Sequence, residues 1–338
     1  MNKEWMARFI ILVLVIAAII IPLAAWRSQS PGTLIHGQMA ETGGWTPGNL
    51  TAEVGKPFHI RLTSDDVTHG FAVGQSVIPP VDVKPGEISE VTLTFDKPGK
   101  YTFYCTRWCS VNHWRMRGTI EVKGGNTASE KPVALPLYVR LGLDIDAVQL
   151  ADVIPEKKPS ALRGESLVAL YALQPMITRY QITEYYLAHS PVEIWKGLRA
   201  APETKKLSDQ DIWDLVAFIW RSEFSPQDLQ EGKRLFTTNC VACHGENGAG
   251  DGVFAAQLAN SKSGEKANMN PGAMTVRPAD FTNPNTMLSA SSARLQGKIL
   301  RGGMGTGMPY WGPILTEDQT WDLVDYLWAF QFDLEDKP

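Results

Sequence analysis

One segment of the chain carries a dense group of soft metal donors. Two cysteines, a histidine and a methionine follow the spacing Cys105-x3-Cys109-x3-His113-x2-Met116, and His69 stands at the end of an earlier strand-like run. Thiolate, imidazole and thioether ligands together favour copper. A mononuclear blue-copper site uses one cysteine, so the second one allows both sulfurs to bridge two copper ions. A centre of this kind favours electron transfer over bond chemistry.

Two alternatives to copper use the same residues. A disulfide between Cys105 and Cys109 would leave the spacing of the histidine and the methionine as a coincidence. Zinc would not need the thioether. The full set of five donors therefore favours copper over both.

A second group of residues indicates covalent haem attachment. Cys240 and Cys243, followed directly by His244, form the C-x-x-C-H motif of c-type haem. His244 is the candidate proximal iron ligand, and a methionine commonly supplies the second axial ligand. Met308, which precedes a proline just before the last helix, is favoured over Met304. A thioredoxin-like C-x-x-C is disfavoured, because it explains neither the adjacent histidine nor the downstream Met-Pro.

Composition excludes several broad classes of protein. The chain has 338 residues with 32 Lys+Arg against 36 Asp+Glu, and 20% of its residues are charged while 44% are apolar. This balance is typical of globular domains and excludes wholesale disorder. The net charge of −4 provides no basic footprint for nucleic acid. We find no nucleophile–base pair, phosphate loop or acid–base dyad, so no catalytic residue is assigned.

The amino terminus is predicted to be a membrane anchor, over residues 1–27. Residues 9–26 contain no charge and as a helix would span roughly 27 Å, close to the hydrocarbon thickness of a bilayer. A cleaved signal peptide is the alternative, although its apolar region is usually shorter and ends in a better cleavage site. Everything after Arg27 is then expected to lie on one side of the membrane.

Residues 28–46 are rich in Gly, Ser, Thr and Pro and are predicted to form a tether. From 47 to 124 short runs alternate between apolar and polar residues, as at Phe58, Ile60 and Leu62, and Pro-Gly turns separate them. This pattern predicts a small antiparallel β-sandwich.

Beyond residue 134 the pattern becomes helical and repeats itself. Residues 207–220 match residues 315–328 at a constant offset of 108. We therefore predict two related all-α domains, over 135–225 and 226–338. The first contains no cysteine and is interpreted as a degenerate copy that serves as a spacer. A non-covalent haem held by His189 and Met176 is the less favoured alternative.

The copper segment resembles a known family. Residues 50–123 are similar to the cupredoxin domain with a dinuclear CuA centre of cytochrome c oxidase subunit II, which also occurs in nitrous oxide reductase. Residues 226–332 resemble class I cytochromes c. The first resemblance implies five side-chain ligands and one backbone carbonyl: His69, Cys105, Cys109, His113, Met116 and the carbonyl of Arg107.

Arg107 departs from the family pattern. Oxidase subunits usually have a glutamate there, whose side chain helps to hold magnesium at the interface with subunit I. A guanidinium cannot ligate magnesium. Arg107, Arg115 and Arg117 also make the ligand loop basic, which suits either an acidic or propionate-bearing partner or a solvated rim.

These features predict a multidomain protein: one transmembrane helix, an all-β cupredoxin sandwich and two cytochrome c-like helical domains. The expected function is electron entry into a haem–copper oxidase-type complex, from c-type haem to CuA and on to a membrane-embedded catalytic subunit I. The electron donor would be a cytochrome or another carrier on the outer, periplasmic side. A CuA-containing nitric oxide reductase, a free-standing tethered redox shuttle and a copper-delivery protein are the alternatives.

Overall fold

The computed structural model describes most of the chain after residue 31. The described residues are Val13, Val15, Ile16, 32–76, 78–110, 112–125, 134–260, 277–303 and 307–334. Apart from those three apolar residues, the predicted anchor over 1–27 lies outside this set. Within the described residues, no helix is both long enough and apolar enough to cross a bilayer.

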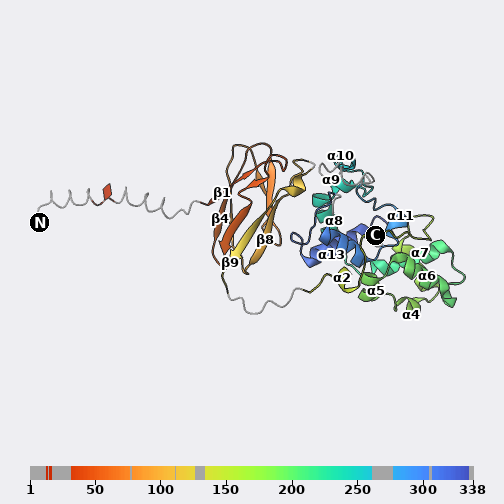
Figure 1. The fold of residues 1–338 in the computed structure, drawn as a ribbon. Helices are drawn as coiled ribbons and strands as arrows, with labels where there is room; N and C mark the ends of the chain where they lie inside the picture. The colour runs from red at the N-terminus through yellow and green to blue at the C-terminus, as the bar shows by residue number, and fades with distance from the viewer. Residues whose placement is uncertain are drawn as a thin grey trace, which may run out of the picture.

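The amino-terminal part of the described chain is a sandwich of two sheets, drawn in orange and yellow in Figure 1. One sheet has the strand order β2-β1-β4-β7 and the other has the order β3-β9-β8-β5-β6. The strands are β1 Thr33–Gly37, β2 Trp45–Thr46, β3 Asn49–Glu53, β4 Phe58–Ser64, β5 His69–Val73, β6 Val81–Val83, β7 Ser89–Leu93, β8 Gly99–Cys105 and β9 Arg117–Lys123.

Alternating side chains form the core between the sheets. In β3 the burial alternates strictly along the strand, with Leu50 and Ala52 buried between exposed neighbours. Ile60 and Leu62 of β4 are buried in the same way and face Phe103 and the other apolar residues of the opposite sheet in one cluster. The period of two in the sequence therefore gives the two-layer sandwich that it predicts.

Two details of the predicted sandwich are wrong. Residues 33–46 belong to the sandwich as β1 and β2, although a tether was expected over 28–46; Ile35 and Trp45 are buried there. The sheets are also not purely antiparallel, because β1 pairs with β4 and β3 pairs with β9 in parallel. Parallel pairing joins strands that are not connected by a tight turn, so turn signals in the sequence could not reveal it.

The carboxy-terminal half is helical, drawn from green to blue in Figure 1, and its helices α8 and α13 lie on the side nearer the sandwich. The helices are α2 Leu137–Arg140, α3 Ala161–Leu170, α4 Gln174–Ile177, α5 Thr183–Ala188, α6 Pro191–Ala200, η2 Pro202–Thr204, α7 Asp209–Arg221, α8 Pro226–Asn239, α9 Val241–His244, α10 Ala255–Asn260, α11 Pro284–Met287, α12 Ser292–Arg301 and α13 Glu317–Trp328; the short 3-10 helix η1 (His113–Arg115) lies in the sandwich.

The sequence repeat is matched by a repeated helix crossing. α7 and α13 both begin with a capping box, at Ser208 and Thr316. α3 packs on α7 where Gly164 meets the Asp214 carbonyl, and α8 packs on α13 where Gly232 meets the equivalent carbonyl of Asp322. A β-carbon at either glycine would lie about 2 Å from that oxygen, so both crossings require glycine.

The two copies share one hydrophobic core. Trp220 of α7 and Trp328 of α13 are almost fully buried, and their rings meet at 5.7 Å. Backbone hydrogen bonds also join the copies, from Ala161 N to the Asp333 carbonyl and from Asp333 N to the Pro159 carbonyl. The haem-less copy is therefore packed into the second copy and not merely linked to it.

Candidate copper and haem sites

The sandwich brings the predicted copper ligands together at one end. His69 begins β5, Cys105 ends the neighbouring strand β8, and the ligand atoms of His69, Cys105 and Cys109 all lie within 4.8 Å of one another. The Sγ atoms of Cys105 and Cys109 are 3.9 Å apart, and the Met116 Sδ lies 3.4 Å from the Cys109 Sγ. Both cysteines are free thiols, so the alternative of a disulfide between them is not what the structure contains.

His113 lies on the short helix η1, outside the group of three residues whose ligand atoms fall within 4.8 Å of one another. Its ring is buried, and its Nδ1 has no hydrogen-bond partner among the described residues. A buried imidazole nitrogen without a partner is costly unless a ligand occupies it. Two thiols, two imidazoles and a thioether are donor types that suit copper, so the chemistry of these residues fits a copper centre.

A carboxylate orients the first histidine. Asp66 Oδ1 lies 2.7 Å from His69 Nε2, while His69 Nδ1 lies 3.9 Å from the Cys105 sulfur. A hydrogen bond from Nε2–H fixes the tautomer and leaves Nδ1 as the nitrogen able to bind a metal. Although burial opposes it, the contacts with Cys105 and Asp66 raise the pKa of His69.

The two thiols do not ionise alike. The contact with Cys109 lowers the pKa of Cys105 to about 3, although burial opposes this shift. The same contact, together with burial, raises the pKa of Cys109 well above its ordinary value. The contact between the two sulfurs therefore favours a single thiolate in the pair, and a bound cation would favour loss of the second proton.

Arg107 offers its carbonyl to this cluster and turns its guanidinium away. The Arg107 carbonyl lies 3.2 Å from the Cys105 sulfur and accepts from Cys109 N at 2.8 Å. The guanidinium donates to both oxygens of Asp82 from Nε and Nη2, at 2.8–2.9 Å. The Arg107 carbonyl thus lies beside the cluster for which the resemblance implies it as a ligand, while the side chain forms an ion pair within the chain.

The haem motif directly follows α8, with Cys240 as its C-cap and the remaining residues in the short helix α9. His244 is buried, its ring stacks on Phe281 with centroids 4.6 Å apart, and its Nδ1 lies 3.0 Å from the Ala279 carbonyl. That hydrogen bond leaves Nε2 as the nitrogen for an iron atom. Burial lowers the pKa of His244, and it raises the pKa of Cys240 to about 12 and that of Cys243 to about 11.

Met308 lies beside the carboxy-terminal end of α12, in the segment 307–311 that we call the Met308 loop. Gly303 N donates to the Met308 carbonyl at 3.1 Å, and Trp311 N donates to the Ile299 carbonyl, so this segment lies against the end of the helix. Gly302 has φ +69° and faces the same carbonyl, which leaves no room for a side chain. Met308 is partly buried against the hydrophobic core. Met304, the alternative ligand, lies outside the described residues.

Comparison with known proteins finds a family match for each of the two segments that contain the candidate copper and haem residues. Residues 48–123 match the family model described as cytochrome C oxidase subunit II, periplasmic domain, and residues 229–331 match the model described as cytochrome c. The chain therefore contains a segment similar to a subunit II periplasmic domain, followed by a segment similar to cytochrome c. The two models together leave the haem-less helical copy unmatched.

The individual relatives cover parts of the chain. Cytochrome c oxidase subunit 2 of Thermus thermophilus is 41% identical over 80 residues, which are 24% of this chain and 58% of that protein. A nitrous-oxide reductase of Ralstonia nicotianae is 41% identical over 59 residues, 18% of this chain and 9% of that enzyme. The solved periplasmic domain of cytochrome oxidase subunit II from Bradyrhizobium japonicum is 27% identical, with a TM-score of 0.21, and the match covers 22% of this chain and 54% of that one. The chain thus spans about half the length of its curated oxidase relatives.

Three residues that support the subunit II domain were missed by sequence reasoning. Asp66 bonds His69, Glu41 accepts hydrogen bonds from Ser110 and Asn112 in the ligand loop, and Trp45 Nε1 donates to the Met116 carbonyl. The spacing Asp66-x2-His69 was a usable signal. Glu41 and Trp45 could not be found, because both lie in the segment expected to be a tether.

The residues proposed for a non-covalent haem in the first copy have structural contacts. His189 stacks on Tyr185 with centroids 4.7 Å apart and lies 3.8 Å from Glu193. Met176 is buried in the helical core. These contacts are consistent with a packing role for both side chains.

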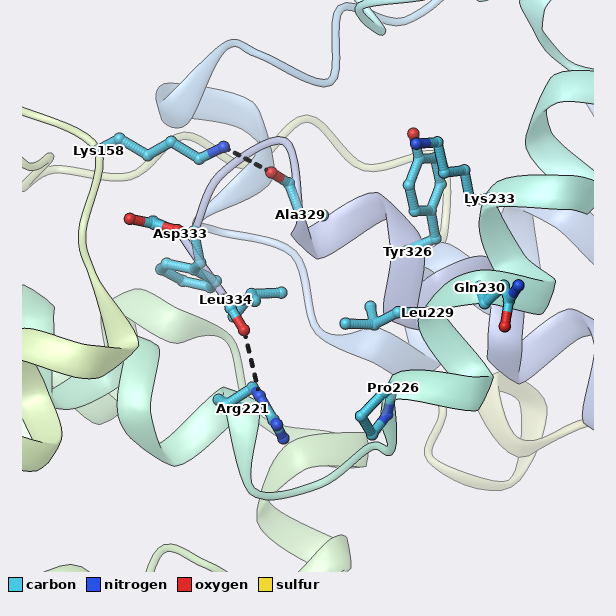
Figure 2. A pocket seen from close by; sticks show the side chains of 11 residues that line it. Lys158, Arg221, Pro226, Leu229, Gln230, Lys233, Tyr326, Ala329, Asp333 and Leu334 are labelled. Carbon is cyan, nitrogen blue, oxygen red and sulfur yellow. Dashed lines mark hydrogen bonds between the residues drawn. The ribbon is translucent and has the colours of Figure 1, made fainter. Parts of the chain in front are cut away.

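A cavity of about 440 Å³ lies at the seam between the haem-less copy and the cytochrome c domain (Figure 2). Lys158 Nζ donates to the Ala329 carbonyl and Arg221 Nε donates to the Leu334 carbonyl across it. None of the predicted copper or haem ligands lines this cavity. Its polar groups tie the carboxy-terminal segment to the first copy, so we assign it to the seam and not to a cofactor.

Proposed function

We propose that this chain is the electron-entry subunit of a haem–copper oxidase-type respiratory complex. The observation that supports the proposal is the cluster of His69, Cys105 and Cys109 with the Met116 sulfur beside it. This cluster lies in a segment that matches a subunit II periplasmic domain, and a segment that matches cytochrome c follows it. When bound, a c-type haem and a dinuclear copper centre supply one-electron transfer at these two sites.

Each set of residues has a defined part in this proposal. Cys240 and Cys243 attach the haem, and His244 and Met308 bind its iron. The copper centre is held by the side chains of His69, Cys105, Cys109, His113 and Met116 and by the backbone carbonyl of Arg107. The rigid β-sandwich holds these donors in one geometry, which keeps the reorganisation on electron transfer small.

The partners and location follow from the same proposal. Residues 1–27 anchor the chain in the membrane, with both cofactor domains on the outer face. An external cytochrome or similar carrier delivers electrons, and a membrane-embedded haem–copper subunit I receives them. A donor domain tethered to its acceptor has a high effective concentration, so a fused cytochrome replaces a diffusing one.

A second candidate is the corresponding subunit of a CuA-containing nitric oxide reductase. The observation that favours it is the bidentate Arg107–Asp82 ion pair. It holds a guanidinium at the position where oxidase subunits usually have a magnesium-binding glutamate. The docking face presented to a catalytic subunit therefore differs from the usual oxidase interface.

The deciding experiment is to isolate the native complex from membranes through this chain and to measure its reduction of oxygen and of nitric oxide. Oxygen uptake with reduced cytochrome c as donor supports the oxidase subunit. Nitric oxide turnover without oxygen uptake assigns the chain to the reductase. A chain that is isolated alone, with both cofactors reducible, contradicts both and leaves a tethered shuttle.

A further inference from the structure

The copper-ligand loop and the Met308 loop touch each other in the folded chain. Arg117, the residue after Met116, donates from Nη1 to the Tyr310 carbonyl at 2.8 Å. Its guanidinium also lies over the rings of Tyr310 and Trp311, at 5.0 and 5.7 Å from their centroids. The hydrogen bond joins residues 193 positions apart in the sequence.

Arg117 is fixed from the copper side as well. Its Nε donates to the Trp114 carbonyl at 2.9 Å, inside the ligand loop. The side chain thus connects the loop that carries His113 and Met116 to the segment that follows Met308. Burial lowers the pKa of the guanidinium but leaves it a cation at neutral pH, and partial desolvation strengthens its contacts with the aromatic faces.

A second contact joins the haem-attachment side to the same loop. The ring of Phe254 lies 6.4 Å from the ring of His113. Phe254 N donates to the carbonyl of Ala242, which lies between the two haem-attaching cysteines. The copper-ligand loop therefore contacts both the segment that packs on the Cys-x-x-Cys-His motif, through Phe254, and the Met308 loop, through Arg117.

The backbones also meet without intervening side chains. Gln75 N donates to the Ile314 carbonyl at 3.1 Å, and a β-carbon on Gly74 would lie only 2.6 Å from the Pro313 carbonyl. Tyr104, which precedes Cys105, packs against the helical core. Only an arrangement that brings the two backbones this close requires a residue without a β-carbon, so Gly74 is specific to this docked arrangement.

We propose that Arg117 is a positioning residue that docks the cytochrome c domain onto the copper-ligand loop, and that this docked arrangement is the one in which an electron passes between the two sites. The proposal rests on the proposed function. With haem held by His244 and Met308 and copper held by the ligand loop, this arrangement would let one electron pass from haem to copper, with no bond made or broken. A reduced external carrier would supply the replacement electron to the haem.

The test uses the full-length chain in detergent with both cofactors bound. Arg117→Gln removes the cation and the rigid fork, and Arg61→Gln is the matched control, because Arg61 lies in β4 and pairs with Glu90 within the sandwich. Gly74→Leu is a second variant that wedges the two domains apart without altering the copper or haem ligands.

Two readouts separate docking from electron transfer. Hydrogen exchange of the Gln75 amide reports docking. The transfer rate is measured by reducing the haem with a light flash and recording the change in the copper absorbance with time. A lost hydrogen bond to a charged group corresponds to a factor of about ten or more. We expect both variants to exchange Gln75 about tenfold faster and to transfer electrons at least tenfold more slowly, with both absorption spectra and the control unchanged.

Unchanged exchange and unchanged transfer in Gly74→Leu would overturn the docking proposal. If Arg117→Gln disturbs the copper spectrum, Gly74→Leu alone decides, because it leaves the ligand loop intact. The proposed function fails in a different way: the parent chain would bind both cofactors and show a protected Gln75 amide, yet pass no electron between the sites.

Discussion

Trp220→Ala tests whether the haem-less copy and the cytochrome c domain unfold as one unit. Trp220 is 1% exposed, and its ring contacts Trp328 at 5.7 Å and Phe332 at 6.1 Å, both from the second copy. Replacing a buried tryptophan by alanine costs about 3–5 kcal/mol. The buried indole N–H finds no hydrogen-bond partner among the described residues, so its removal relieves a penalty of about 1 kcal/mol and places the loss near 3 kcal/mol.

The assay is urea unfolding followed by the haem absorbance, which reports only the second copy. With a slope of about 2–3 kcal/mol per molar urea, the midpoint should fall by roughly 1–1.5 M. Trp213→Ala is the second variant, and it distinguishes one cooperative unit from two independent ones. Trp213 is fully buried in the same helix but stacks on Trp195, inside the first copy.

A single cooperative unit predicts that both variants lower the haem-reported midpoint by similar amounts. If Trp213→Ala leaves that midpoint unchanged while the fluorescence transition shifts, the copies unfold independently and the reasoning from the shared core is refuted. In the single-unit case, deletion of 135–225 should also destabilise haem binding. The interpretation of this region as a spacer predicts the opposite result, with both cofactors retained.

Three further predictions follow from single side chains. Burial, together with the nearby Asp228, Asp322 and Glu223, raises the pKa of Asp325 to about 7; the native state therefore binds the extra proton, and stability should fall by up to about 4 kcal/mol as pH rises from 4 to 7. Asp325→Asn keeps an acceptor for Tyr186 and should flatten this slope in urea unfolding at several pH values; an unchanged slope would contradict the assignment. Asp66→Asn should weaken copper binding about 10–100-fold in chelator competition, since it removes the anionic partner of His69, and parent-like affinity would exclude that role. His244→Ala should abolish the low-spin haem spectrum and leave the copper absorption intact; simultaneous loss of the copper band would show that the two sites do not assemble independently.

The candidate ligands could be predicted because their signals are local. Cys105, Cys109, His113 and Met116 lie within twelve residues, and the C-x-x-C-H motif within five, so spacing alone indicates the chemistry. The structure then places the cysteine and methionine sulfurs of the first group within contact distance of one another.

The supporting residues could not be predicted, because they approach from distant parts of the chain. Glu41 reaches the ligand loop from 69 residues away, in a segment whose composition indicated a tether. Short strands such as Thr33–Gly37 give a weak alternating signal, and this strand is stabilised by parallel pairing with β4. Such pairing depends on tertiary structure and leaves no turn signature in the sequence.

Residue types and short periods were enough to predict the donor residues, the all-β and all-α regions and the internal repeat. Tertiary structure alone decided three other things. It gave the two helical copies one core, it buried Asp325 beside other acids, and it placed Arg117 against the Met308 loop. Contacts between residues far apart in the chain depend on how whole elements pack, and side-chain burial sets both their strength and the pKa values of the groups they enclose.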